Sequence, residues 1–201
     1  MKPGIYNISN EDYHHNPEYS AMSKGGWMDF AKSPEYYQWR KANPSEPSRA
    51  MLDGTQFHTA VLEPARYRDE YIVAPADINR RTKDGKEAWA YFESISVGKI
   101  VVTQDKMDMV AGMVTALGKS ETASALLSGG VAEQSIFWED PLGFLCKCRP
   151  DLLVPKHRTV VELKSTADVS PKALQNTIER YRYNWQNYFY MDGIYSVLPE
   201  K

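Results

Sequence analysis

Three apolar runs separated by short turn signals lie in the second half of the chain, and they constrain the fold more than any other feature. Residues 132–138 alternate between apolar and polar side chains, and residues 144–153 and 159–164 form two further runs. Residues 140–143 (Asp-Pro-Leu-Gly) and 155–158 (Pro-Lys-His-Arg) lie between the runs and favour tight turns. Strands joined by such short turns pair antiparallel. The sequence therefore predicts an antiparallel three-stranded meander.

The remainder of the chain carries mainly helical signals. Serine caps the first turn of a helix and proline fits its first position, so both mark helix starts. The periodicity and these signals predict helices over residues 23–31, from 33 onward, and over 54–64, 104–127 and 170–195. Short strands are expected at 67–75 and 98–103, and loops at 43–48 and 79–87, with helix resuming near 87. No linker divides the chain, so we expect one domain, residues 1–201, of the mixed α/β class.

The composition is that of an ordinary globular protein. Of 201 residues, 42% are hydrophobic, and the net charge is −2. We expect no membrane association and, with no signal peptide visible, a cytoplasmic location. The net charge argues against binding of nucleic acid through overall charge, but it allows a local basic groove. Cys146 and Cys148 are too few for a structural zinc site and are expected to be small buried side chains.

The chemistry of a site is suggested by Pro150-Asp151 followed by Glu162-Leu163-Lys164. We expect Asp151 near the end of the second strand and Glu162 within the third. Glu162 and Lys164 are two residues apart, so both project to one face of a strand. Two carboxylates with a phosphate and water form the oxygen ligands that Mg²⁺ prefers, and a nearby lysine can act on the attacking water.

Taken alone, this spacing is a weak signal, because charged residues two apart are common on solvated strand faces. The neighbours of Glu162 and Lys164 on the third strand are apolar, however, and buried charges without partners are costly. Two further residues could join the site. Glu133 lies on the first strand, where it could equally be a surface charge. Gln186 shares a helical stripe with Tyr183 and Tyr190, and that stripe could equally be core.

Several segments together resemble the nuclease domain of the RecE (exonuclease VIII) family. They include Gly4-Ile-Tyr, Ser33-Pro-Glu-Tyr-Tyr-Gln-Trp-Arg40, Gly54-Thr-Gln-Phe-His58, Asn79-Arg-Arg-Thr82, Ile136-Phe-Trp-Glu-Asp-Pro141, Cys148-Arg-Pro-Asp151, Glu162-Leu-Lys164 and Tyr183-x-x-Gln186-x-x-x-Tyr190. This family is similar to λ exonuclease and belongs to the PD-(D/E)xK superfamily. The resemblance implies a restriction-endonuclease-like core, in which helices flank a central mixed sheet that contains the antiparallel meander.

The resemblance also implies a role for each matching residue. His58 would be a metal ligand together with Asp151, Glu162 and the carbonyl of Leu163. Lys164 would be the catalytic lysine. Gln186 and Tyr183 would position the scissile phosphate or the attacking water, and Glu133 would assist at the metal. By composition alone, His58 could also be an ordinary helix histidine.

The activity implied by the resemblance is hydrolysis of linear duplex DNA from 5′ ends with Mg²⁺, for which Mn²⁺ can substitute at an oxygen-rich site. The family acts in prophage recombination with a RecT-like annealing partner and forms a ring tetramer. Two departures stand out. Glu162 stands where the family often has Asp, and the chain ends at Lys201, where RecE domains continue with further elements. We therefore expect the C-terminal part of the family to be missing.

Basic residues provide candidate contacts to the DNA backbone. Lys147 and Arg149 lie on the strand beside the expected site, and a basic cluster could form a second contact, although it could also be a solvated loop. The cluster comprises Arg80, Arg81, Lys83 and Lys86. The alternative function is a catalytically impaired prophage remnant that binds DNA ends or metal without turnover. Hydrolysis of another substrate is a weaker alternative, since Walker A, serine-elbow and HExxH motifs are all missing from the sequence.

Overall fold

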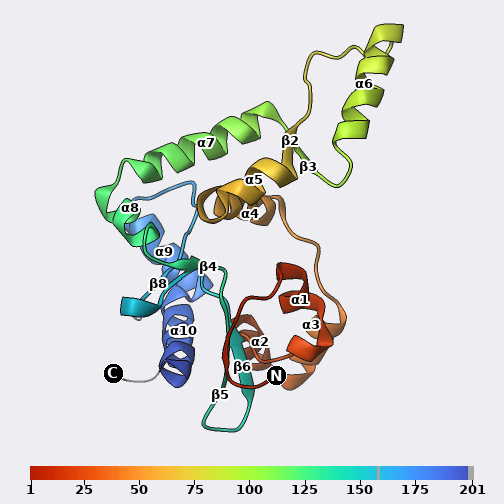
Figure 1. Cartoon of the computed structure of the whole chain (residues 1–201). Coiled ribbons are helices and arrows are strands. Elements are labelled where there is room, and N and C mark those ends of the chain that lie inside the picture. The colour runs from red at the N-terminus through yellow and green to blue at the C-terminus, as the bar shows by residue number, and fades with distance from the viewer. Residues whose placement is uncertain (158, 199–201) are drawn as a thin grey trace. The chain divides into compact units, whose positions relative to one another are not determined.

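The computed structural model describes residues 1–157 and 159–198 and divides the chain into two units (Figure 1). The first unit combines Met1–Glu46 with the chain from Leu127 onward, and the second spans Pro47–Leu126. The class is mixed α/β, as predicted, with helices around small sheets. Among the described residues, no helix is both long and apolar enough to cross a membrane.

The strands of the first unit form two three-stranded antiparallel sheets. One sheet has the order β1 (Gly4–Tyr6), β5 (Ser135–Glu139), β6 (Leu145–Cys148). The other has the order β4 (Val131–Ala132), β7 (Leu152–Val154), β8 (Thr159–Val161). The meander was predicted with continuous strands, but the first and second predicted strands are each divided in two, so their halves lie in different sheets.

A single register nevertheless runs through both sheets. Ala132 lies opposite Leu152, and Ile136, four residues further along, lies opposite Cys148. The interruption therefore comes from local conformation rather than from a shift in pairing. Pro150 has no N–H to donate to a ladder, and Glu133 opposite this region has a positive φ of 53°. Both features break the ladder at the same level.

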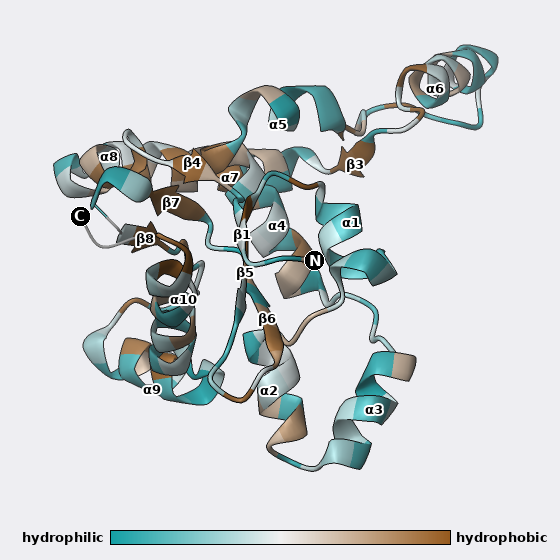
Figure 2. Cartoon of the chain, turned by 60° about the horizontal axis from the view of Figure 1, so that its bottom comes forward, coloured by the Kyte–Doolittle hydropathy of each residue, from teal (hydrophilic) through white to brown (hydrophobic). Residues whose placement is uncertain are grey.

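The core of the first unit lies between its strands and its last helix. Helix α10 (Tyr183–Val197) packs on β5 and β6. The cluster of buried side chains comprises Ile136, Trp138, Cys146, Cys148, Leu153 and Ile194. The prediction that both cysteines are buried is confirmed, and both are free thiols. Figure 2 shows the same apolar character along β7 and β8.

The N-terminal helices of the first unit follow their predicted starts. Helices α2 (Lys24–Phe30) and α3 (Pro34–Ala42) begin after Ser23 and Ser33, whose hydroxyls accept hydrogen bonds from first-turn amides. They are preceded by α1 (Asn10–His15) and a 3-10 turn (Pro17–Tyr19). A second 3-10 turn (Pro155–His157) stands where the turn 155–158 was predicted; Arg158 lies outside the described residues.

The expected long helix 170–195 is divided into α9 (Pro171–Tyr181) and α10. Arg182 separates them in a left-handed conformation, with φ 55°. Glycine or asparagine usually marks such a position, so an arginine gave no signal of a break. The consequence is that α10 has its own direction and can pack on the sheet independently of α9.

The second unit is mainly helical, with α4 (Arg49–Leu62), α5 (Pro64–Glu70), α6 (Lys83–Ile95) and α7 (Gln104–Gly118). It ends within α8 (Glu121–Leu127), whose last residue begins the C-terminal part of the first unit. Its strands, β2 (Tyr71–Val73) and β3 (Ile100–Val102), pair in parallel. The predicted helix 104–127 is interrupted between α7 and α8. Helix α4 also begins before its predicted start at residue 54.

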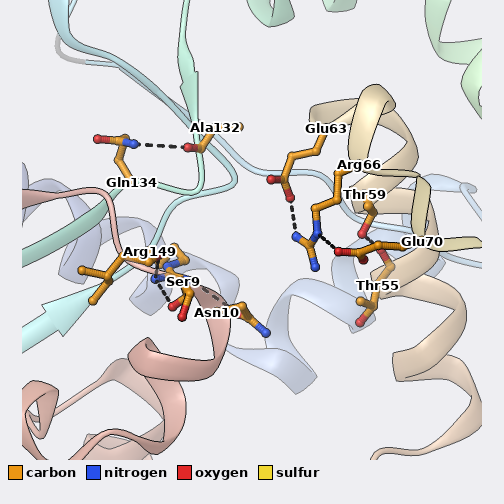
Figure 3. A network of polar contacts seen from close by, with 11 residues as sticks. Ser9, Asn10, Thr55, Thr59, Glu63, Arg66, Glu70, Ala132, Gln134 and Arg149 are labelled. Carbon is orange, nitrogen blue, oxygen red and sulfur yellow. Dashed lines mark hydrogen bonds and ion pairs between the residues drawn. The ribbon is translucent and has the colours of Figure 1, made fainter. Parts of the chain in front are cut away.

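Two predictions in this unit were wrong. Residues 67–70 belong to α5 rather than to a strand, because Pro64 begins a helix that Arg66 stabilises through ion pairs with Glu63 and Glu70 at 2.6 and 2.7 Å (Figure 3). Residues 83–87 belong to α6 rather than to a loop. There the Thr82 hydroxyl accepts a hydrogen bond from the Gly85 amide and caps the helix.

Candidate active site

Asp151 and Glu162 lie opposite each other where the β7–β8 ladder ends. Leu152 pairs with Val161, so Asp151 and Glu162 are the next positions along the two strands. The Asp151 amide donates a hydrogen bond to Glu162 Oε1 at 3.2 Å, and the Leu163 amide donates one to Asp151 Oδ2 at 2.6 Å. Glu162 was expected within its strand, but it lies just beyond it. Each carboxylate therefore accepts a backbone N–H from the other strand's end.

Two other predicted catalytic side chains contact the second carboxylate oxygen of Glu162. Lys164 Nζ lies 2.7 Å from Glu162 Oε2, and Gln186 Nε2 donates to the same oxygen at 2.5 Å. The Glu162 side chain is 12% exposed and the Lys164 side chain 32% exposed. The Lys164 side chain is thus more accessible to solvent than that of Glu162, which is largely enclosed.

Burial and like charge both act on Glu162. Burial raises the pKa of its carboxyl, the charge of Asp151 raises it further, and Lys164 partly opposes the shift. Burial also raises the pKa of Tyr190, with the negative charge of Glu162 as the next cause. Two close carboxylates with one lysine leave negative charge in a poorly solvated place, where a cation would be stabilised.

Helix α10 brings Gln186 and Tyr183 to the site. Its direction is set by Arg182 and by the approach of Gly193 to Trp138. A Cβ at position 193 would lie 2.7 Å from the Trp138 ring, so only glycine allows this packing. The ring of Tyr183 lies with its centroid 5.2 Å from Lys164 Nζ. Sequence patterns did not reveal the contact between Gly193 and Trp138, because it joins positions that are distant in the chain.

Glu133 lies in the break between β4 and β5. Its amide donates to the Asp151 carbonyl at 3.1 Å, which holds it opposite the site. It was predicted on the first strand, but its positive φ places it outside the ladder. Glu133 and Gln186 both line a cavity of about 320 Å³, whose other walls include Lys24, Lys147 and Arg149.

Lys147 and Arg149 hold the N-terminal segment against this cavity. Lys147 Nζ donates to the carbonyls of Tyr13 and Tyr19 at 2.5 and 2.9 Å. Arg149 donates to the Ser135 hydroxyl and to the backbone of residues 8 and 9, and the arginine is seen beside Ser9 in Figure 3. Their predicted contact with DNA remains a prediction. The structural role of the N-terminal segment was not foreseen, since it depends on long-range contacts.

The remaining predicted residues belong to the second unit. His58 is half-buried on α4, and its role as a metal ligand remains a prediction. The Arg80 guanidinium lies over the Trp89 ring, and Lys83 lies 4.0 Å from Glu87 on α6. Arg81 is exposed, and its amide donates to the Asn79 side chain. Contact of this basic cluster with DNA remains a prediction.

The donor set suits a magnesium ion. Within residues 1–157 and 159–198, no three His, Cys, Asp or Glu side chains come together as a metal-binding group. Asp151 and Glu162 do supply two adjacent carboxylates. Mg²⁺ is typically held by one or two carboxylates, with waters and substrate phosphate as the other ligands. The two carboxylates therefore suit a Mg²⁺ ion whose remaining ligands are water and substrate phosphate.

Residues 23–200 match the model of a PDDEXK-like domain of unknown function (DUF3799). No curated protein matches the chain. The family match covers Asp151, Glu162 and Lys164, which supply the acidic pair and the lysine after which the superfamily is named. It supports the PD-(D/E)xK part of the resemblance and does not single out RecE. The chain therefore belongs to the family of PDDEXK-like domains, which have a nuclease-type fold.

Proposed function

We propose that this protein is a metal-dependent nuclease that hydrolyses phosphodiester bonds of linear duplex DNA. The observation that carries the proposal is the convergence of Asp151, Lys164 and Gln186 on Glu162 through hydrogen bonds and an ion pair. Resemblance to the RecE family supports the narrower proposal of a 5′ to 3′ exonuclease. The family match supports the superfamily.

Asp151 and Glu162 would hold Mg²⁺, or Mn²⁺ in its place, with the Leu163 carbonyl and His58 as candidate further ligands. When bound, such an ion polarises the phosphoryl oxygen and lowers the pKa of a bound water. The protein holds both carboxylates in place before any ligand arrives, because the amides of Asp151 and Leu163 donate to them. Preorganised ligands of this kind need little rearrangement during the reaction.

Lys164 and Gln186 would act on the substrate. The Lys164 ammonium has three donors, of which Glu162 engages one in the structure. Its exposed side can therefore meet a phosphoryl oxygen or the attacking water. Gln186 orients Glu162 through its amide and lines the cavity beside it. Tyr183 would position the phosphate, and Glu133 would assist at the metal. Lys147 and Arg149 would attract the DNA backbone to the cavity, as Arg80, Arg81 and Lys83 would in the second unit.

The resemblance also supports a biological setting. We propose action in prophage-type recombination, in which a RecT-like annealing protein receives the 3′ single strands that the nuclease leaves. A ring tetramer would be the corresponding assembly. Light scattering of the purified protein tests the assembly independently of activity. A monomer at all concentrations would contradict the ring.

The direct test is digestion of linear duplex DNA labelled at its 5′ or its 3′ end. We expect loss of the 5′ label with Mg²⁺ or Mn²⁺ and none with EDTA. Asp151→Ala and Lys164→Ala should both abolish cleavage. Because Lys164 is not a metal ligand in this proposal, Lys164→Ala should still bind Mn²⁺. Lys172, exposed on α9, provides the control Lys172→Ala, which should cleave like the wild type.

Two results would contradict the proposal. Cleavage by Lys164→Ala at the wild-type rate would remove Lys164 from the mechanism. A folded, metal-binding wild-type protein that digests no linear duplex would instead favour binding of DNA ends or metal without turnover.

A further inference from the structure

An exposed group of aromatic side chains lies where α9 meets α10. Tyr181, Trp185 and Tyr188 are 50%, 54% and 78% exposed, and we call them the aromatic patch. Scattered exposed apolar side chains are common on proteins, but rings that gather around one cavity, as Trp185 and Tyr188 do, mark a candidate binding surface. None of the three belongs to the catalytic group around Glu162.

The patch opens into a largely apolar cavity of about 430 Å³ between α2 and α10. Two members of the patch, Trp185 and Tyr188, line it together with Trp27, Met28, Phe189 and Lys24. Its lining side chains are therefore mostly aromatic and apolar, and one of them, Lys24, carries a positive charge. A cavity of this composition suits a flat aromatic ligand that carries negative charge nearby.

Cations surround the patch. The Arg182 guanidinium lies 5.7 Å from the centre of the Trp185 ring, and the Arg180 guanidinium lies 5.6 Å from that of Tyr181. Lys24 Nζ donates to the Tyr181 carbonyl at 2.7 Å. Exposed aromatic rings interleaved with basic side chains are the recurring surface of proteins that bind single-stranded nucleic acid.

The patch is continuous with the candidate active site. The ring of Tyr181 stacks on that of Tyr183, with centroids 5.8 Å apart and planes at 19°. Tyr183 in turn lies beside Lys164. Lys24 lines both this cavity and the cavity that contains Glu133 and Gln186. A strand whose phosphate reaches Glu162 would thus have its neighbouring bases within reach of the patch.

We infer that the aromatic patch binds unpaired nucleobases of the DNA strand by stacking, next to the bond that is cut. This inference rests on the proposed nuclease function. It specifies the substrate further, as a DNA end that carries unpaired bases. Stacking on an aromatic ring tolerates any base, because every base has a π-face. The arginines and Lys24 would bind the phosphates of the same strand.

Binding measured with EDTA present tests the inference without cleavage. The probes are a fluorescent oligothymidylate of about 16 nucleotides and an abasic strand of the same length, which keeps the phosphates and lacks the bases. Trp185→Ala should bind oligothymidylate about 5- to 150-fold more weakly than the wild type, the usual range for loss of one stacked base. Trp185→Phe should retain much of the affinity.

Trp39 on α3 provides a matched control, since it is 57% exposed and lies outside this cavity. Trp39→Ala should bind oligothymidylate like the wild type. The abasic strand should bind wild type and Trp185→Ala equally. Wild-type affinity for oligothymidylate in Trp185→Ala would overturn the inference. The inference would also fall if Trp185→Ala changed only the oligomeric state, since the patch would then be an interface between copies.

The two proposals can fail separately. If the wild type bound oligothymidylate more tightly than the abasic strand but cleaved no DNA, the proposed nuclease function would be wrong and the single-strand binding site would stand. If the wild type cleaved DNA but bound oligothymidylate and the abasic strand with equal affinity, the nuclease function would stand and the stacking site would be wrong.

Discussion

Replacement of Gly193 by alanine tests how the active-site helix is held. Gly193 is buried on α10, against the indole of Trp138 in β5. A Cβ there would lie 2.7 Å from Cε3 and from Cζ3 of the ring and 3.1 Å from Cδ2. Carbon atoms in contact normally stay at about 3.5–4.0 Å. Trp138 is 1% exposed, so the ring is enclosed by the core and cannot move without displacing its neighbours.

The expected cost follows from two opposing terms. Overpacking a well-filled core usually costs about 1–3 kcal/mol. Alanine is favoured over glycine inside a helix by about 1 kcal/mol, which offsets part of that cost. We therefore expect Gly193→Ala to lower the free energy of unfolding by up to about 2 kcal/mol. Because α10 also carries Gln186, a displaced helix should lower nuclease activity as well.

Gly112 on α7 is the matched control. It also lies inside a helix, but a Cβ there would meet no heavy atom within 4 Å. Gly112→Ala should therefore raise stability by about 0.5–1 kcal/mol. Urea unfolding followed by circular dichroism measures both variants against the wild type. If Gly193→Ala proved as stable as Gly112→Ala, the close packing of α10 on Trp138 would be refuted.

Two further predictions concern single side chains. Ser33→Ala should lower the free energy of unfolding by about 1 kcal/mol, because the Ser33 hydroxyl caps α3 by accepting the Tyr36 amide; an unchanged urea midpoint would contradict this role. Burial lowers the pKa of Lys147 from 10.5 to about 8. Between these pH values the unfolded chain binds more protons at this residue than the folded chain does, so this group makes stability rise with pH. The stability of the wild type relative to Lys147→Met should therefore increase from pH 8 to 10.5 in urea titrations, and a constant difference would refute the shift.

The parts of the fold that sequence predicted well depend on local signals. Ser23 and Ser33 mark helix starts because a capping hydroxyl lies three residues from the amide that it serves. Asp151 and Glu162 were predicted to share a site because a short connection fixes the register of two neighbouring strands. In both cases the partners are close in sequence, so the chain itself limits the possible geometries.

The wrong predictions lie where local signals were ambiguous or where long-range contacts determine the structure. Arg182 adopts a left-handed conformation that its side chain does not favour, so the break between α9 and α10 carried no sequence mark. Similarly, Gly193 gave no sign that it faces Trp138. The strand signal of residues 67–75 comes mainly from Tyr71, Ile72 and Val73, which do form β2. Residues 67–70 are helical instead, because Pro64 and the ion pairs of Arg66 favour a helix there.

The break in the sheet and the position of the carboxylates have one origin. In an uninterrupted ladder, the backbone amides of Asp151 and Leu163 would bind carbonyl oxygens of neighbouring strands. Here Pro150 and the turn at Glu133 end the pairing, and those amides donate to the side chains of Glu162 and Asp151 instead. Carboxylates thus take the place of carbonyls at the end of the ladder. The interruption that divides the predicted meander is therefore what fixes both acidic groups beside Lys164 in the candidate site.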